Sequence, residues 1–237
     1  MKLPINLNIE VIKIKRGEYI MSNAYNQVDI YCEDEFINPT ISSPNTSFEL
    51  PFYQTKETLM DVEIYKRFLD NAMSRFRHSR VYKDYKSYLM GLGLDRCQFQ
   101  SNLTSEMCSI EMHHHFLTLF DISLIITEHV LNTKGYISTF DLVKLLKEEH
   151  MNNRVGLVML ATTNHQLYHN NPEFFIHPNM LFGNWAEFLE KYNKGITQDV
   201  AFKILFYLKR AIEEGGSNDN GLLTLYDKIQ DWSMYNV

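Results

Sequence analysis

The chain has 237 residues, of which 45% are hydrophobic, and its formal net charge at pH 7 is -6. This much apolar sequence excludes a chain that is disordered over most of its length, and it supports one large domain or two small ones. The acidic balance excludes an evenly basic nucleic-acid binder, because phosphate contact requires local positive potential. Three cysteines without metal-ligand spacing, and no apolar leader segment, favour reduced thiols in a cytoplasm.

The N-terminal quarter combines a strand pattern with a long connector. Residues 5–14 alternate apolar and polar side chains, which predicts a strand with a possible partner at residues 18–21. Residues 23–55 are rich in turn formers and are expected to connect rather than to form a core. We therefore expect residues 1–55 to form an N-terminal β segment and connector.

Residues 58–89 are expected to be one long helix, or two helices joined near Ser79, because apolar side chains recur at three- and four-residue spacing. This helical segment, residues 56–95, also carries the densest cationic stretch of the chain. Interleaved aromatic side chains allow two readings, a nucleic-acid-facing surface or a solvated helix face whose aromatics point inward. The candidate nucleic-acid-binding residues are Arg75, Arg77, Arg80, Lys83 and Lys86.

Five of the nine histidines fall in two short segments. The first, Ser109 to His114 followed by His115, reads as a strand in which neighbouring side chains face opposite ways. The second carries His165 and His169, four residues apart, so both project from one face of a helix and can reach a single ion. Three histidines with an open fourth position suit a catalytic divalent-metal site.

The sequence between the two histidine segments predicts two helices, at residues 116–131 and 138–150, with a turn at 132–135. The first apolar run is too short and too charged to cross a bilayer, so we expect it in the core. His129 and His150 are expected to be helix-end or surface histidines. Further helices are predicted from Gly183 to Tyr192, at 198–213 and at 222–232, with a polar linker at 213–221.

These motifs resemble the HNH, or ββα-metal, nuclease family. The shared features are the Glu111-Met112-His113-His114 strand end, the strand from Gly156 that runs without a gap into His165, and the HxxxH pair. A Tyr82-Lys83-Asp84-Tyr85 segment and Cys97 ahead of them are similar to phage-encoded members. The resemblance covers roughly residues 75 to 195, and it implies an α+β, predominantly helical fold around a ββα-metal (His-Me finger) core at residues 96–195, followed by C-terminal helices at 196–237.

The resemblance implies a metal-dependent endonuclease that hydrolyses DNA phosphodiester bonds in a bacterial or phage-infected cytoplasm. His113, His165 and His169 would hold one divalent ion (Mg²⁺, Mn²⁺ or Zn²⁺), His114 would be the general base, and Glu111 would orient a histidine. His115 has no role in the family pattern. The alternative is a catalytically inactive ββα-metal protein that acts as a nucleic-acid or protein binding module, such as a phage regulatory or inhibitor protein.

Two departures from the family pattern bear on this reading. Gly156 stands where the family has the asparagine that ties down the loop around the general base, and Asn152, Asn153 and Asn164 are the candidate substitutes. Ala161 and Asn164 occupy the positions of the family's cysteine pair, so a structural zinc knuckle is not expected and any metal would be the catalytic one.

Overall fold

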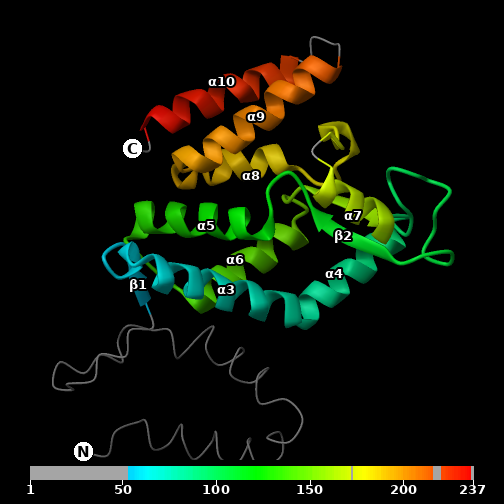
Figure 1. Ribbon diagram of the computed structural model, residues 1–237. Helices are drawn as coiled ribbons and strands as arrows, with labels where there is room; N and C mark the ends of the chain where they lie inside the picture. The colour runs from blue at the N-terminus through cyan, green and yellow to red at the C-terminus, as the bar shows by residue number, and fades with distance from the viewer. Residues whose placement is uncertain (1–52, 172, 216–219, 236–237) are drawn as a thin grey trace, which may run out of the picture. The chain divides into compact units, whose positions relative to one another are not determined.

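The protein was examined as a computed structural model, which describes residues 53–171, 173–215 and 220–235. The predicted N-terminal strand, its partner and most of the connector lie outside these residues. The described part is mostly helical, with two separate two-stranded antiparallel sheets (Figure 1). The α+β class predicted from the sequence is therefore confirmed.

Helices α3 (Val62–His78) and α4 (Arg80–Gly91) meet at Ser79, as the sequence predicted. Ser79 has an extended backbone, and its hydroxyl accepts a hydrogen bond from the backbone N–H of Tyr82, 3.2 Å away. One serine thus ends the first helix and caps the second. The apolar face of α3 is buried at Leu69, Ala72 and Phe76.

Helices α5 (Leu119–Lys134) and α6 (Thr139–Met151) both begin with a complete capping box, Thr118 with Asp121 and Ser138 with Asp141. The predicted turn at 132–135 is wrong in its first three residues, because α5 continues to Lys134. Only Gly135 breaks the helix, with a left-handed backbone at φ 85° that a residue with a Cβ adopts at a cost.

The sheet that carries the histidine motif pairs β2 (Ile110–His114) with β4 (Leu157–Ala161), with His113 opposite Val158. Every residue of β4 is buried, which explains its uninterrupted apolar sequence. Helix α7 (Thr162–Asn170) starts at the residue after β4, so the HxxxH segment folds back beside β2. The second sheet, β1 (Tyr53–Thr55) with β3 (Tyr136–Ser138), was not predicted, since three-residue strands leave almost no periodic signal.

The main core runs from Leu59 to Ile229 and joins all the longer helices. Helix α8 (Trp185–Lys191) leads through a 3-10 turn to Gly195, where a Cβ would come within 1.9 Å of the Ile125 carbonyl of α5. Helices α9 (Gln198–Gly215) and α10 (Asn220–Tyr235) then lie side by side and antiparallel (Figure 1). Among the described helices, none has the length and apolarity needed to cross a membrane.

Candidate metal centre

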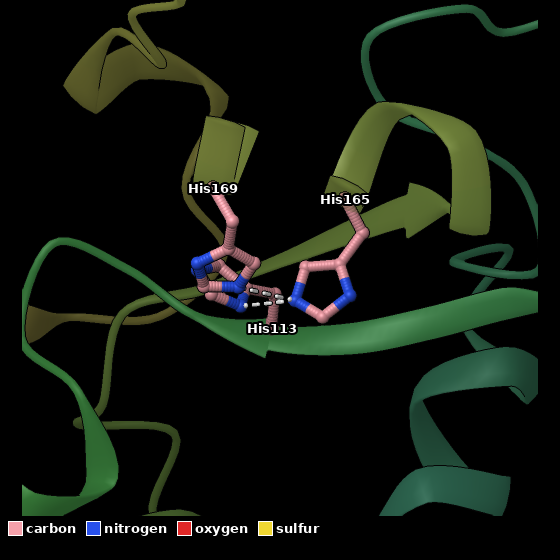
Figure 2. A group of neighbouring side chains, drawn as sticks. All are labelled: His113, His165 and His169. Atoms are coloured by element: carbon pink, nitrogen blue, oxygen red, sulfur yellow. Dashed lines mark hydrogen bonds between the residues drawn. The ribbon is translucent and has the colours of Figure 1, made fainter. Parts of the chain in front are cut away.

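Three histidines that are distant in sequence converge between β2 and α7. Nε2 of His165 lies 3.0 Å from Nδ1 of His113 and 3.0 Å from Nε2 of His169, and all three ligand atoms lie within 4.8 Å of one another. Figure 2 shows the ring of His113 rising from the strand toward the two rings that descend from the helix. His169 is exposed and the other two are half-buried, so the group opens to solvent on one side.

A carboxylate fixes the orientation of the central ring. Nδ1–H of His165 donates to Oε2 of Glu111 at 2.5 Å, and the hydroxyl of Thr162 donates to the other carboxylate oxygen at 2.8 Å. These hydrogen bonds, from Thr162 first and from His165, lower the pKa of Glu111. With Nδ1 protonated, Nε2 of His165 presents its lone pair to the other two rings, which is the arrangement that a metal ligand requires.

The electrostatic environment keeps His113 uncharged. Burial most of all, and after it the neighbouring His165 and His169, lower its pKa to about 4, and Glu111 opposes them with a smaller effect. A neutral imidazole at neutral pH has a free lone pair, whereas an imidazolium would repel a cation. The donor set of three imidazoles around one point therefore fits a divalent transition-metal ion.

His114 does not lie where the sequence reading placed it. It is only 9% exposed and projects from the opposite face of β2, where its Nε2 lies 2.8 Å from Nε2 of His150. Burial, and after it the neighbouring His150, hold the pKa of His114 well below its ordinary value. Side chains of α3, α4 and α6 cover this face, so His114, the predicted general base, does not face the three converging histidines.

His150 is the second member of this buried histidine pair. It lies in the last turn of α6, as predicted, but it is 0% exposed and therefore not a surface residue. Its Nδ1–H donates to the Leu146 carbonyl at 2.7 Å, so its Nε2 accepts from His114. The rings of Phe76, Tyr82 and Tyr85 surround it, and burial lowers its pKa to about 4.

His115, which the sequence reading left out, shares the face of His113. The two ring centroids are 6.3 Å apart, and Nδ1 of His115 lies 3.1 Å from the hydroxyl of Tyr168. Burial lowers the pKa of His115 to about 3. His115 and Tyr168 line a pocket of about 370 Å³ that also includes His169. The period-two alternation of a strand was the signal available in the sequence, because it places residues 113 and 115 together.

Gly156, which occupies the family's asparagine position, is required by close backbone approach. A Cβ there would lie 2.4 Å from the carbonyl oxygen of His115. Of the candidate substitutes, Asn153 has a left-handed backbone and accepts a hydrogen bond from the hydroxyl of Tyr85 at 3.1 Å. This hydrogen bond ties α4 to the loop before β4. Asn164 instead donates to Cys97 and so anchors the loop before β2, while Asn152 only caps α6.

The basic stretch divides between solvent and core. Phe76 and Tyr85 are fully buried, so for these two aromatics the inward-facing reading is confirmed. The cations are on the outside, and Lys86 contributes to lowering the pKa of Glu111. The exposed members of the stretch are Arg75, Arg77, Arg80 and Lys83, with Lys86 half-buried.

Comparison with known proteins gives one result. No curated protein and no solved structure matches the chain. A family model described as "Bacteriophage G278-like virion protein" matches residues 12–233, which is most of the sequence and includes the whole histidine site. The phage origin expected from the sequence is thereby confirmed, and the chain belongs to the bacteriophage G278-like virion protein family.

Proposed function

We propose that this phage protein is a metal-dependent endonuclease of the HNH class that hydrolyses DNA phosphodiester bonds. The observation that carries the proposal is the convergence of His113, His165 and His169 on a frame of two antiparallel strands followed by a helix. In that reading the frame is a ββα-metal core, and the helices inserted between its strands enclose the buried face of β2. The exposed face of the site is left for substrate.

The spacing of the ligand nitrogens supports one ion. Two nitrogens bound at about 2.0 to 2.1 Å to a single tetrahedral or octahedral ion lie about 2.9 to 3.4 Å apart. Both contacts of His165 measure 3.0 Å, and all three nitrogens lie within 4.8 Å of one another, so a bound ion would draw the rings of His113 and His169 closer together. Mg²⁺, Mn²⁺ and Zn²⁺ are the candidate ions, with the imidazole set favouring the transition metals.

Each residue of the site has a physical task in hydrolysis. A divalent ion bound there would acidify a water molecule and neutralise charge on a phosphate oxygen. Glu111 holds the tautomer and the orientation of His165, so it is a positioning residue rather than a catalytic one. The buried His114 is assigned no proton transfer. Exposed His169 borders the open side, from which a phosphate can approach.

The cations of α3 and α4 provide the local positive potential that the acidic chain otherwise lacks. Arg75, Arg77, Arg80, Lys83 and Lys86 lie within twelve residues, and Lys86 is close enough to Glu111 to affect its pKa. We propose that this surface contacts the DNA backbone near the site, which would make binding salt-dependent.

A second candidate is a virion component that keeps the metal-bound core as a non-catalytic DNA- or protein-binding module. Membership in a virion protein family and the buried position of His114 favour it. The two candidates differ in one result, since a binding module cleaves nothing under any metal.

The test is cleavage of single-stranded, linear double-stranded and supercoiled DNA by the purified full chain with Mg²⁺, Mn²⁺ or Zn²⁺. We expect cleavage by the wild type and a loss of at least about 100-fold in His169→Ala, with His78→Ala, an exposed histidine on α3, as the matched control. Absence of cleavage by the wild type in all metals would leave the binding module, and equal cleavage by His169→Ala would remove the site from the chemistry.

A further inference from the structure

A pocket beside the metal centre has a lining that the proposed chemistry does not use. It shares His169 with the three-histidine group, and its volume is about 370 Å³. Tyr168 forms part of the wall, with its ring centroid 4.9 Å from that of His113 and 5.3 Å from that of His169. Whatever occupies this pocket therefore lies next to any phosphate held at the metal centre.

Aromatic rings dominate the pocket. Tyr168, Phe174, Phe175, Phe206 and Tyr207 line it, and Phe206 from α9 is 64% exposed at the opening. Apolar rings that are gathered in one exposed patch, unlike a single exposed ring, are typical of ligand-binding grooves. Flat aromatic surfaces at such a rim suit the stacking of a planar ring, and every nucleobase offers one.

The charges at the pocket favour a base over a free phosphate. Lys203 forms an ion pair with Asp121, and Arg210 pairs with Glu214 at 2.6 Å while lying 4.5 Å over the ring of Phe175. Both cations at the wall are thus already matched by acidic groups, which weakens any attraction for a phosphate group. The hydroxyl of Tyr168, which lies 3.1 Å from Nδ1 of His115, is a polar group of the wall that can serve the edge of a base.

The size of the pocket selects the form of the nucleic acid. A volume of 370 Å³ lies at the small end of the range of about 300 to 1,000 Å³ that is typical of small-molecule sites. One nucleotide fits that space, but a base pair within a duplex cannot enter it. A base and its own phosphate are separated by a single sugar, which corresponds to the wall that pocket and metal centre share at His169.

We propose that this pocket stacks one unpaired nucleobase beside the metal centre, so that the protein acts on single-stranded or unpaired DNA. The proposal rests on the proposed endonuclease function for its substrate class. It assigns Phe206 to the stacking platform, together with Phe174, which also lines the pocket.

The chain offers a matched control for Phe206. Phe202 lies one turn earlier on α9 and is 74% exposed, but it does not line the pocket. Because both rings are largely in solvent, neither Phe206→Ala nor Phe202→Ala is expected to disturb folding. Any difference between the two variants therefore reports on the pocket.

The experiment measures binding without cleavage. The full chain in EDTA is titrated into a single-stranded DNA oligonucleotide that contains 2-aminopurine, whose fluorescence is quenched on stacking, and into the same oligonucleotide paired with its complement. We expect quenching with the single strand, a dissociation constant raised roughly 5- to 100-fold in Phe206→Ala, and no change in Phe202→Ala. The duplex should bind at least about 10-fold more weakly than the single strand.

Three results would overturn the pocket assignment: no binding of the single strand, equal binding of single strand and duplex, or equal behaviour of the two phenylalanine variants. The outcome is separable from the proposed function. A protein that quenches the probe but cleaves no DNA in any metal loses the nuclease assignment and keeps the pocket. A protein that cleaves DNA but is indifferent to Phe206→Ala loses the pocket and keeps the nuclease assignment.

Discussion

The buried pair of His114 and His150 makes the stability of the fold depend on acid. Both rings are neutral in the folded state, because burial lowers the pKa of His150 to about 4 and holds that of His114 well below its usual range. In the unfolded chain a histidine has a pKa of about 6.5. Between these values the unfolded state binds more protons, so the free energy of unfolding must fall as the pH falls.

The size of this fall in the free energy of unfolding can be worked out for His150 alone. With a folded pKa of about 4 and an unfolded pKa of about 6.5, protonation of the unfolded chain costs about 2 kcal/mol of stability at pH 5 and about 3 kcal/mol at pH 4. Above pH 7 the contribution is constant. The pKa values of His113 and His115 are also lowered in the folded state. The free energy of unfolding of the wild type therefore falls more steeply with falling pH than His150 alone would require.

The assay is urea unfolding of the metal-free protein at pH 7, 6 and 5, followed by circular dichroism. His150→Gln should be less stable than the wild type at pH 7, by about 1 to 3 kcal/mol for the lost buried hydrogen bond. Between pH 7 and pH 5, its free energy of unfolding should nevertheless fall by about 2 kcal/mol less than that of the wild type. His78→Gln, at an exposed histidine, should keep the wild-type slope. A His150→Gln slope equal to that of the wild type would refute the reasoning.

Three further predictions concern the metal centre and its frame. Zn²⁺ or Mn²⁺ at 100 times its dissociation constant should stabilise the wild type by about 2.7 kcal/mol in thermal unfolding, and the same ion should give no such stabilisation in His169→Ala. Glu111→Gln should weaken metal affinity about 10- to 100-fold in calorimetric titration, because the amide is uncharged and has one acceptor oxygen in place of the two that accept from His165 and Thr162. The exposed Glu106→Gln is its control, and equal affinities would show that the carboxylate does not matter. Gly156→Asn, which introduces the asparagine of the HNH pattern, should lower the free energy of unfolding by about 1 to 3 kcal/mol, since its Cβ would lie 2.4 Å from the His115 carbonyl, and unchanged urea unfolding would contradict the close approach.

Local patterns predicted most of the elements and the three histidines that converge. The HxxxH spacing fixes two rings on one helix face whatever surrounds it, and capping residues such as Ser138 mark a helix start from adjacent atoms alone. Strand alternation also separated His113 from His114 correctly. These signals act over a few residues, and so a single sequence carries them.

The side of β2 that faces solvent could not be predicted in the same way. That choice depends on which helices pack on each face, and His150, which covers His114, is supplied by α6 from 36 residues further along the chain. The role of Gly156 was equally hidden, because its contact is with the backbone of His115 on the partner strand. Tertiary packing, rather than periodicity, determines both.

The central claim is that His113, His165 and His169 hold one divalent ion with a position left open for water or phosphate. The most direct measurement is anomalous diffraction from crystals of the full chain grown with Mn²⁺ or Zn²⁺. The account predicts a peak at about 2.0 to 2.2 Å from Nδ1 of His113 and from Nε2 of His165 and His169, with water completing the coordination. A peak elsewhere, no peak, or a fourth protein ligand that closes the site would contradict it.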